Sequence, residues 1–328
     1  MTSFWNDLPQ PFFVLAPMEA VTDVVFRHVV ERAGAPDVFF TEFANATGWV
    51  HAGDRAIAGR LIKTDDEYPL VAQIWGGEPG DMEQFAQHCA RLGFAGIDIN
   101  MGCPAKSAIK SGGAALIRNP DVAVAAIAAA KTAGLPVSVK TRLGYSTVDE
   151  WRAWLTTLLQ QDIVNLTIHL RTKKEMSKVA AHYELIDDIV ALRDTIAPQT
   201  LLTINGDIRD RAHGMTLVAA HPGVNGVMIG RGVFADPFCF APHSDSVAQG
   251  SSSMAQRNFT LLCYHLDLFD HWQPQLGRPY ETLKRFYKIY IRDFDGAKEL
   301  RDQLMHTTST DEARHVIHQW HETMRTSE

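Results

Sequence analysis

Short apolar runs recur at regular intervals through the first three quarters of the chain. Eight of them, rich in β-branched residues, cover 12–16, 38–43, 70–75, 96–100, 137–141, 166–169, 202–205 and 226–229. Because these runs are almost continuously apolar, the pattern predicts strands that are buried on both faces. Segments with helical spacing lie between most of the runs, at 21–33, 81–92, 120–133, 148–161, 183–196 and 209–220.

The regular alternation of strands and helices indicates the fold class. Eight strand-helix repeats within roughly 240 residues are typical of a TIM (β/α)8 barrel. A doubly wound open sheet is the alternative, but the first strand-helix turn, residues 17–20, reads PMEA and lacks the G-x-G-x-x-G loop of that fold. We therefore predict an α/β protein built on a TIM barrel.

The character of the chain changes after Pro242. Residues 249–253 read QGSSS, which is typical of a polar linker. Residues 254–328 have helical spacing and no clear strand. The sequence thus predicts a catalytic TIM-barrel domain over residues 1–243 and a small all-helical C-terminal domain over residues 254–328.

Composition limits the class of protein and the cellular compartment that we expect. The 328 residues are 46% hydrophobic and 21% charged, as is usual for a soluble globular protein. The longest apolar run, 122–130, is too short to cross a bilayer, and the N-terminus lacks a secretory pattern. The four cysteines form no C-x-x-C pair and the histidines have no metal-binding spacing, so we expect no metal site and a reducing cytoplasm.

Polar residues occur in or directly after most of the predicted strands, where a TIM barrel builds its active site. Taken singly, each could be structural: Gln73 could bond backbone groups, and the glycines could form ordinary turns. A lysine among apolar strand residues, however, favours an anionic partner, and the loops after strands seven and eight often bind phosphate. The set comprises Glu19, Glu42, Gln73, Asn100, Lys140, Arg142, His169, Arg171, Asn205, Gly206, Asp207, Gly230 and Arg231.

A flavin mononucleotide (FMN) fits this set of residues. Its phosphate would lie on the glycine turns near Arg231, where backbone N–H groups can approach an anion. The Gln73 amide would supply a donor and an acceptor to its pyrimidine edge, and Lys140 would stabilise the negative charge of the reduced ring. We therefore predict one shared anionic cofactor at the carboxyl ends of the strands.

Cys103 is the most distinctive single candidate. A lone cysteine is more often a small core residue than a catalyst, and Cys89, Cys239 and Cys263 are interpreted in that way. Cys103 instead follows a strand end and lies between Gly102 and Pro104. A largely protonated thiol there could act as a general acid or as a nucleophile, and both roles are open from local chemistry.

Five segments together resemble the FMN-dependent tRNA-dihydrouridine synthase family. They are 16–23 (APMEAVTD), 98–104 (DINMGCP, with Lys106 just beyond), 137–144 (VSVKTRLG), 205–208 (NGDI) and 227–232 (VMIGRG). They occur in the family's order and span the predicted barrel. The resemblance implies an FMN-binding TIM barrel followed by a helical tRNA-binding domain, with tRNA as substrate and NADPH as reductant.

The resemblance also implies individual roles. Cys103 would give a proton to C5 of uracil while the flavin N5 delivers hydride to C6. Asn100, Lys106 and Arg171 would lie on the substrate side. The implied FMN contacts are Pro17, Met18, Glu19, Gln73, Lys140, His169, Asn205, Gly206, Asp207, Gly230 and Arg231.

The chain departs from the family pattern at three places. Ala20 stands where the family usually has glycine, and 169–172 read HLRT where the family often has HGRT. The following loop, 173–182, lacks the usual Gln, Tyr and Gly pattern. Since that loop covers the active site in the family, the target nucleotide stays open.

The net charge of −7 is unusual for a nucleic-acid binder, because phosphate contacts need basic groups. The best local candidate is 281–292, where Lys284, Lys288 and Arg292 would share one face of a helix next to Arg285, with aromatic residues between them. A solvated helix face is the alternative, since ten Lys and Arg stand against eleven Asp and Glu from Ser251 onward. With the barrel evidence, we predict that these four residues contact tRNA.

Two other functions are compatible with the barrel. One is a small-molecule FMN oxidoreductase of the dihydroorotate dehydrogenase type, which would not explain the helical tail or Cys103 in NMGCP. The other is a non-catalytic RNA- or flavin-binding relative, against which the intact Cys103 and Lys140 argue. NADPH and NADH are both open as reductant, since no dinucleotide fingerprint is present.

Overall fold

The computed structural model describes residues 3–106, 108–110, 112–242 and 253–326. These fall into two compact units, one of Met1–Val24 and Pro36–Arg231 and the other of Val25–Ala35 and Gly232–Glu328. The predicted linker lies outside the described residues except for Ser253, which caps a helix.

The first unit is a parallel barrel. The sheet runs in the order β1-β9-β8-β7-β6-β5-β4-β2, and a parallel bridge between Val14 and Val38 joins its two ends. The predicted TIM barrel is confirmed. Its strands are β1 (Phe12–Leu15), β2 (Phe39–Phe40), β3 (Ala44–Asn45), β4 (Leu70–Trp75), β5 (Gly96–Asn100), β6 (Val137–Arg142), β7 (Asn165–His169), β8 (Leu201–Asn205) and β9 (Gly226–Ile229).

The predicted second strand, 38–43, is two short strands. Both β2 and β3 pair with β4, and the residues between them leave the strand conformation. The backbone N–H of Gln73 donates to Thr41 Oγ1 at 3.0 Å instead of to a backbone carbonyl. A side chain therefore replaces the ladder at this point, which an apolar pattern does not reveal.

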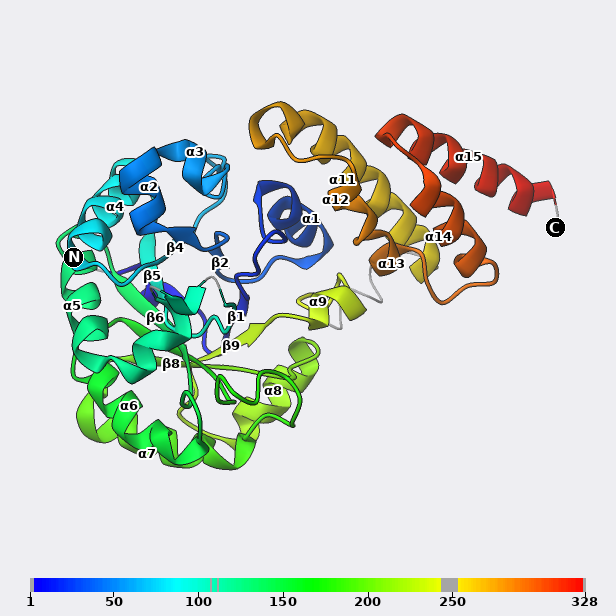
Figure 1. Ribbon diagram of the computed structural model, residues 1–328. Coiled ribbons are helices and arrows are strands. Elements are labelled where there is room, and N and C mark those ends of the chain that lie inside the picture. The colour runs from blue at the N-terminus through cyan, green and yellow to red at the C-terminus, as the bar shows by residue number, and fades with distance from the viewer. Residues whose placement is uncertain (1–2, 107, 111, 243–252, 327–328) are drawn as a thin grey trace. The chain divides into compact units, whose positions relative to one another are not determined.

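Helices α4 to α8 surround the strands (Figure 1). Their polar residues face outward and their apolar residues pack on the sheet. Helices α2 and α3, before β4, were not predicted. The helices associated with the barrel sequence are α1 (Val24–Gly34), α2 (Ala46–Ala52), α3 (Asp54–Ile57), α4 (Pro79–Arg91), α5 (Pro120–Lys131), α6 (Trp151–Leu159), α7 (Ile186–Ile196) and α8 (Arg211–Ala220), with 3₁₀ turns η1 (Phe4–Asp7), η2 (Ala108–Lys110), η3 (Gly113–Arg118), η4 (Val148–Glu150) and η5 (Tyr183–Leu185).

The buried side chains of the barrel divide into an apolar and a polar part. Around β1, β2 and β9 they are apolar, with Phe12, Phe40 and Met228 in one cluster. On β5 to β7, apolar residues alternate with buried or half-buried polar ones, and Gln73, Asp98 and Ser138 are in register on neighbouring strands. The predicted burial of these strands on both faces is confirmed, and the polar groups are accommodated because they bond to one another inside the barrel.

The second unit is helical, which confirms the predicted helical region. It contains α1 together with α9 (Gly232–Ala235), α11 (Met254–Leu276), α12 (Glu281–Lys284), α13 (Tyr287–Tyr290), α14 (Ala297–His306) and α15 (Thr310–Thr326). Its core includes the Phe26 ring, 5.1 Å from that of Phe286, and a 2.7 Å hydrogen bond between His265 Nδ1 and Tyr290 Oη.

The predicted continuous helix over 281–292 is wrong. Helix α12 ends at Lys284, α13 begins at Tyr287, and Ile291 has φ −98° and ψ 85°, so Arg292 lies beyond the helix. Tyr287, Ile289, Tyr290 and Ile291 are all buried. A single straight helix would point these residues in too many directions to bury them all on one face.

Within the described residues, no single helix is both long and apolar enough to cross a membrane. One sharply bent pair, Ala108–Arg118 with Pro120–Lys131, meets that test by length and composition.

Candidate active site

A chain of buried hydrogen bonds leads to Cys103 at the carboxyl end of β5. Gln73 Nε2 donates to Asp98 Oδ2 at 2.7 Å, and Asn100 Nδ2 donates to Gln73 Oε1 at 3.0 Å. Asn100 Oδ1 then accepts from the backbone amides of Gly102 and Cys103, at 3.1 and 2.9 Å. The Asn100 side chain thus fixes the backbone that carries the thiol.

The Cys103 thiol is held in its protonated form. Burial raises its pKa, and the nearby Glu19 carboxylate acts in the same direction. The Ala105 amide, Arg142 and Lys140 act in the opposite direction without overcoming burial. A thiol that keeps its proton at neutral pH is suited to donate one.

Arg142 connects the Cys103 loop with the loop after β7. Its Nε donates to the Gly102 carbonyl at 2.7 Å, and its NH1 donates to the carbonyls of Thr172 and Met176 at 3.1 and 3.0 Å. Burial lowers the pKa of this guanidinium to about 10. The group remains charged at neutral pH and adds positive potential beside the thiol.

Lys140 and His169 lie among other cations. Lys140 Nζ donates to Asn205 Oδ1 at 3.4 Å, and burial, followed by the charge of Arg142, lowers its pKa to about 8. The pKa of His169 is lowered strongly, by burial first and then by Arg142, Lys140, Arg171 and Arg231. His169 is therefore neutral, and its Nε2 accepts from Arg171 NH1 at 3.1 Å.

The loop after β8 brings the last predicted residues together. Asp207 forms an ion pair with Arg171 NH2, and its other oxygen accepts from Arg231 NH2 at 3.0 Å. Gly206 has φ 125°, and a Cβ there would lie 3.1 Å from His169 Cδ2. Only glycine allows this close approach of the backbone to His169.

This site fits an anionic cofactor such as FMN. Four cations lower the pKa of His169, and Asp207 pairs with two of them, Arg171 and Arg231. A phosphate group could interact with the same cations. Gly206 and Gly230 would leave room for it. Gln73 is fully buried and already bonded on both amide ends, so only one N–H and one lone pair remain for a flavin.

The first sequence block lies at the same end of the barrel. Pro17 is buried, Met18 is half-buried, and the exposed Glu19 is held by an ion pair with Arg60 NH2. An electrostatic interaction connects Glu19 with Cys103. Lys106 is exposed.

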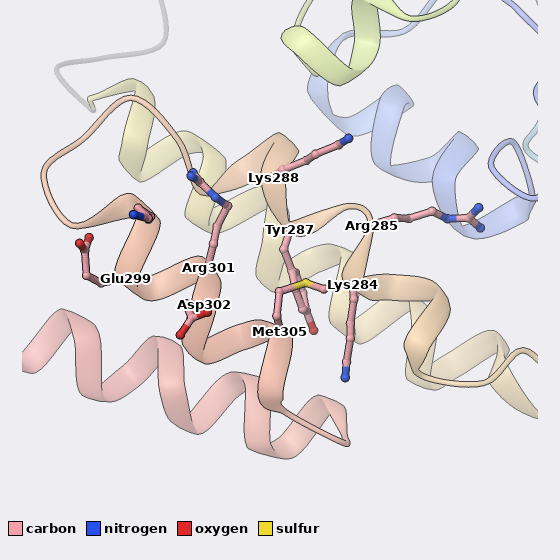
Figure 2. Close-up of a pocket in the computed structure, with 9 residues that line it drawn as sticks. Lys284, Arg285, Tyr287, Lys288, Glu299, Arg301, Asp302 and Met305 are labelled. Carbon is pink, nitrogen blue, oxygen red and sulfur yellow. The ribbon is translucent and has the colours of Figure 1, made fainter.

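The helical unit has a separate basic cavity of about 700 Å³ (Figure 2). Lys284, Arg285 and Lys288 line it, whereas Arg292 donates to the Ala235 carbonyl and pairs with Asp293. Figure 2 shows the three basic side chains pointing in different directions from α12, α13 and the turn between them. The full lining is Lys284, Arg285, Tyr287, Lys288, Lys298, Glu299, Arg301, Asp302 and Met305.

Sequence reasoning missed several residues of these sites. Asp98 lies within the segment DINMGCP, and strict alternation along β5 could have placed it beside Asn100. Arg142 is among the predicted strand-end residues, but its hydrogen bonds to the loop after β7 were not predicted. Arg60 carried no signal, because only the tertiary structure brings it to Glu19. Lys298 and Arg301 come from α14, and their place in the cavity depends on how α14 packs on α13.

Among the residues that the structure describes, no group of three His, Cys, Asp or Glu side chains could hold a metal ion. The site instead combines a protonated thiol, a neutral histidine and several cations at the carboxyl ends of parallel strands. Such an arrangement belongs to the class of TIM-barrel enzymes.

Comparison with known proteins identifies the family. The family described as Dihydrouridine synthase (Dus) matches residues 14–325. "Probable tRNA-dihydrouridine synthase 2" of Bacillus subtilis (strain 168) is 55% identical over 317 residues, covering 96% of this chain and 95% of that protein. "Probable tRNA-dihydrouridine synthase" of Staphylococcus aureus (strain Mu50) is 52% identical, with 96% and 94% covered. The chain belongs to the dihydrouridine synthase family, and the predicted class, an oxidoreductase of this flavin-dependent family, is confirmed.

Proposed function

We propose that this protein is a tRNA-dihydrouridine synthase that uses FMN and NADPH to reduce the C5=C6 bond of specific uridines in tRNA. The names of its relatives, similar over nearly their whole length, support tRNA as the substrate. The observation that carries the proposal is the Cys103 thiol, kept protonated in a loop that Asn100 and Arg142 hold beside buried cations.

The proposed cofactor site is the group of cations around His169 at the carboxyl ends of the barrel strands. Bound FMN would supply hydride from its N5 to C6 of uracil. Lys140 would stabilise negative charge on the cofactor, and Arg231 with the Gly206 and Gly230 backbone would hold its phosphate. The other proposed contacts are Pro17, Met18, Glu19, Gln73, His169, Asn205 and Asp207.

In the proposed proton transfer, Cys103 donates its proton to C5 of uracil. Burial favours this role because it keeps the sulfur protonated until the carbon gains electron density. Neutral His169 would offer a hydrogen bond without adding charge. Asn100, Lys106 and Arg171 are the proposed substrate-side residues.

The basic cavity of the helical unit is the proposed tRNA backbone contact. Lys284, Arg285 and Lys288 line it, and Lys298 and Arg301 increase its positive charge. The target base must leave the folded tRNA to reach the thiol, so contacts away from the barrel would hold the rest of the substrate. Arg292 is a weaker candidate, because it is bonded elsewhere.

The setting that we propose is the cytoplasm. The four cysteines are free, and the structure places Cys89 and Cys239 in buried positions, which agrees with a reducing compartment.

The decisive experiment maps dihydrouridine at each position of tRNA from cells with and without the gene. Loss at a defined position would establish the activity and the target. Where a second enzyme masks the loss, purified protein with unmodified tRNA and NADPH gives the answer. Absence of product there, together with reduction of a free pyrimidine, would replace the proposal by a small-molecule flavoenzyme.

A further inference from the structure

A fully buried carboxylate lies at the start of the hydrogen-bond chain that ends at Cys103. Asp98 Oδ1 accepts from Ser138 Oγ at 2.6 Å, and Oδ2 accepts from Gln73 Nε2 at 2.7 Å. Asp98, Gln73 and Ser138 have no exposed surface. The proposed reaction assigns no step to Asp98, although Asp98 lies two positions before Asn100 on β5 and its side chain therefore points to the same face of the strand.

The direction of each hydrogen bond in this chain depends on Asp98. An ionised carboxylate can only accept, so the Gln73 amide must turn its NH2 group toward it. Gln73 Oε1 then faces Asn100, and Asn100 must turn its own NH2 group toward Gln73. This leaves Asn100 Oδ1 to accept from the amides of Gly102 and Cys103.

Reversal of either amide would break the chain. If Gln73 turned its oxygen to Asp98, two acceptors would meet, and its NH2 group would face the NH2 group of Asn100. If Asn100 also reversed, its NH2 group would face the two backbone N–H groups of the thiol loop. A buried donor facing another donor costs about 1–3 kcal/mol.

We propose that Asp98 is a positioning residue for Cys103: it fixes the orientation of the Gln73 and Asn100 amides and thereby the backbone that carries the thiol. The inference rests on the proposed function, because it deepens the role of Cys103 as proton donor.

An aspartate at position 98 lowers the stability of the folded protein at neutral pH, which a purely structural role would not explain. Burial raises its pKa to about 6, although Ser138, Gln73 and the charge of Lys140 act against that rise. A group whose native pKa is raised above its unfolded value loses stabilisation as pH rises through the interval between the two. The neutral isostere asparagine avoids this loss, so above pH 6 Asp98→Asn should not lower the unfolding temperature.

The test compares Asp98→Asn with the control Thr203→Val in the flavin-loaded full chain. Asparagine keeps the size but offers both a donor and an acceptor, so it no longer fixes the direction. Thr203→Val removes another buried hydrogen bond of the barrel, the 2.8 Å bond to Asn165 Oδ1, which does not lead to Cys103. Three quantities are measured: the unfolding temperature, kcat and KM for unmodified tRNA, and the alkylation rate of Cys103 by iodoacetamide, followed by mass spectrometry.

We expect Asp98→Asn to lower kcat about tenfold, with a smaller change in KM for tRNA and no fall in unfolding temperature, because a misplaced donor slows proton transfer more than it weakens binding. The alkylation rate of Cys103 is divided by the fraction of thiolate at each pH, which gives the reactivity of the thiolate itself. In the wild-type protein this reactivity should change near pH 6, because Asp98 takes up a proton there as the pH falls. In Asp98→Asn the change should be absent. Thr203→Val should lower the unfolding temperature and leave kcat and the alkylation profile unaltered.

Wild-type kcat and an unaltered alkylation profile in Asp98→Asn would overturn the inference. The inference would also be overturned if kcat fell only together with the unfolding temperature, because a purely structural residue would have that effect. The alkylation and unfolding measurements need no tRNA. Absence of dihydrouridine with wild-type protein would therefore refute the proposed function separately, while the alkylation profile would still decide the role of Asp98.

Discussion

At the scale of single residues, burial is the dominant influence on the titratable groups of the site. It raises the pKa of Cys103 and lowers those of His169 and Lys140, so each group moves toward its neutral form. For the thiol and the imidazole, the neutral form is the one that can donate a proton or a hydrogen bond without carrying charge. Lys140 interacts with the buried carboxylate of Asp98, but burial and the charge of Arg142 outweigh that interaction and lower its pKa.

Cys103→Ala should separate flavin chemistry from proton transfer. The variant should stay yellow and oxidise NADPH, because the proposed cofactor contacts lie elsewhere, but it should lose about 10²-fold or more of dihydrouridine formation. The measurement is NADPH consumption and dihydrouridine content with the same unmodified tRNA. A full yield of dihydrouridine would contradict the proton-donor role, and Cys263→Ala, at an exposed cysteine, serves as the matched control.

Ala20→Gly should stabilise the protein by about 1 kcal/mol, because Ala20 has φ 57°, a left-handed conformation that glycine adopts without strain. This also gives a physical reason for the glycine that the family usually has here. Urea denaturation of the two proteins measures the difference. Ala153→Gly, in the exposed face of α6, should instead destabilise by about 1 kcal/mol, so a fall in stability at both positions would contradict the strain.

At the scale of elements, the barrel strands could be predicted closely from sequence. The strands β4, β5 and β9 lie where the apolar runs predicted them, because β-branched residues bounded by loops mark buried strands well. The interruptions at Thr41 and at Arg285 could not be predicted, since each depends on tertiary contacts. For the site, the sequence names candidate residues at the strand ends, which stay predictions. Alternation along β5 places Asp98 on the face of Asn100, but its hydrogen bonds to Gln73 and Ser138 depend on tertiary contacts.

Because the basic segment 281–292 is interrupted, its cations should contribute unequally to tRNA binding. Lys284→Glu with Lys288→Glu should weaken tRNA binding strongly and reduce its salt dependence, because both residues line the cavity. Arg292→Glu should have a smaller effect, since Arg292 already pairs with Asp293. The measurement is tRNA affinity over a range of salt concentrations, with flavin content as the control. Equal effects of the two changes would mean that the cavity is not the binding surface.

The loop after β7, 173–182, should be most protected within a limited pH window. Burial alone would lower the pKa of His182, but its hydrogen bonds to Glu175 and Glu184 outweigh burial and raise it. Burial would raise the pKa of Glu175, but hydrogen bonds from Thr172 and His182 lower it. The histidine contribution is complete below about pH 6.5 and lost as pH rises, and the glutamate contribution is complete above about pH 4.5 and lost as pH falls.

Hydrogen exchange in this loop, corrected for its intrinsic pH dependence, should therefore be slowest near pH 5.5 and faster at pH 8. His182→Asn should remove the rise between these two values. Exchange that is independent of pH in the wild-type loop would contradict the ion pairs with Glu175 and Glu184.

At the scale of the whole molecule, the net charge of −7 conceals an uneven distribution. In the helical unit, Asp267, Asp270 and Asp311 all pair with Arg314, whereas the cavity around Tyr287 has five basic residues against two acidic ones. Binding of a polyanion depends on the local potential more than on the total charge. The overall acidity therefore does not argue against tRNA.

The grouping of α1 with the helical unit predicts how that unit folds. Phe26 of α1 is buried, and its ring lies 5.1 Å from Phe286 and 6.2 Å from both Phe234 and His265. A fragment of residues 254–328 lacks both α1 and α9, so it should expose this cluster and unfold without a cooperative transition.

In the full chain, Phe26→Ala should destabilise the protein by about 3–5 kcal/mol, as expected for a large cavity. Circular dichroism during thermal unfolding tests both, with Met254→Ala, at an exposed position, as the control. A cooperative transition of the fragment would show that residues 254–328 form a domain by themselves. The hydrophobic core of the helical unit would then form without α1.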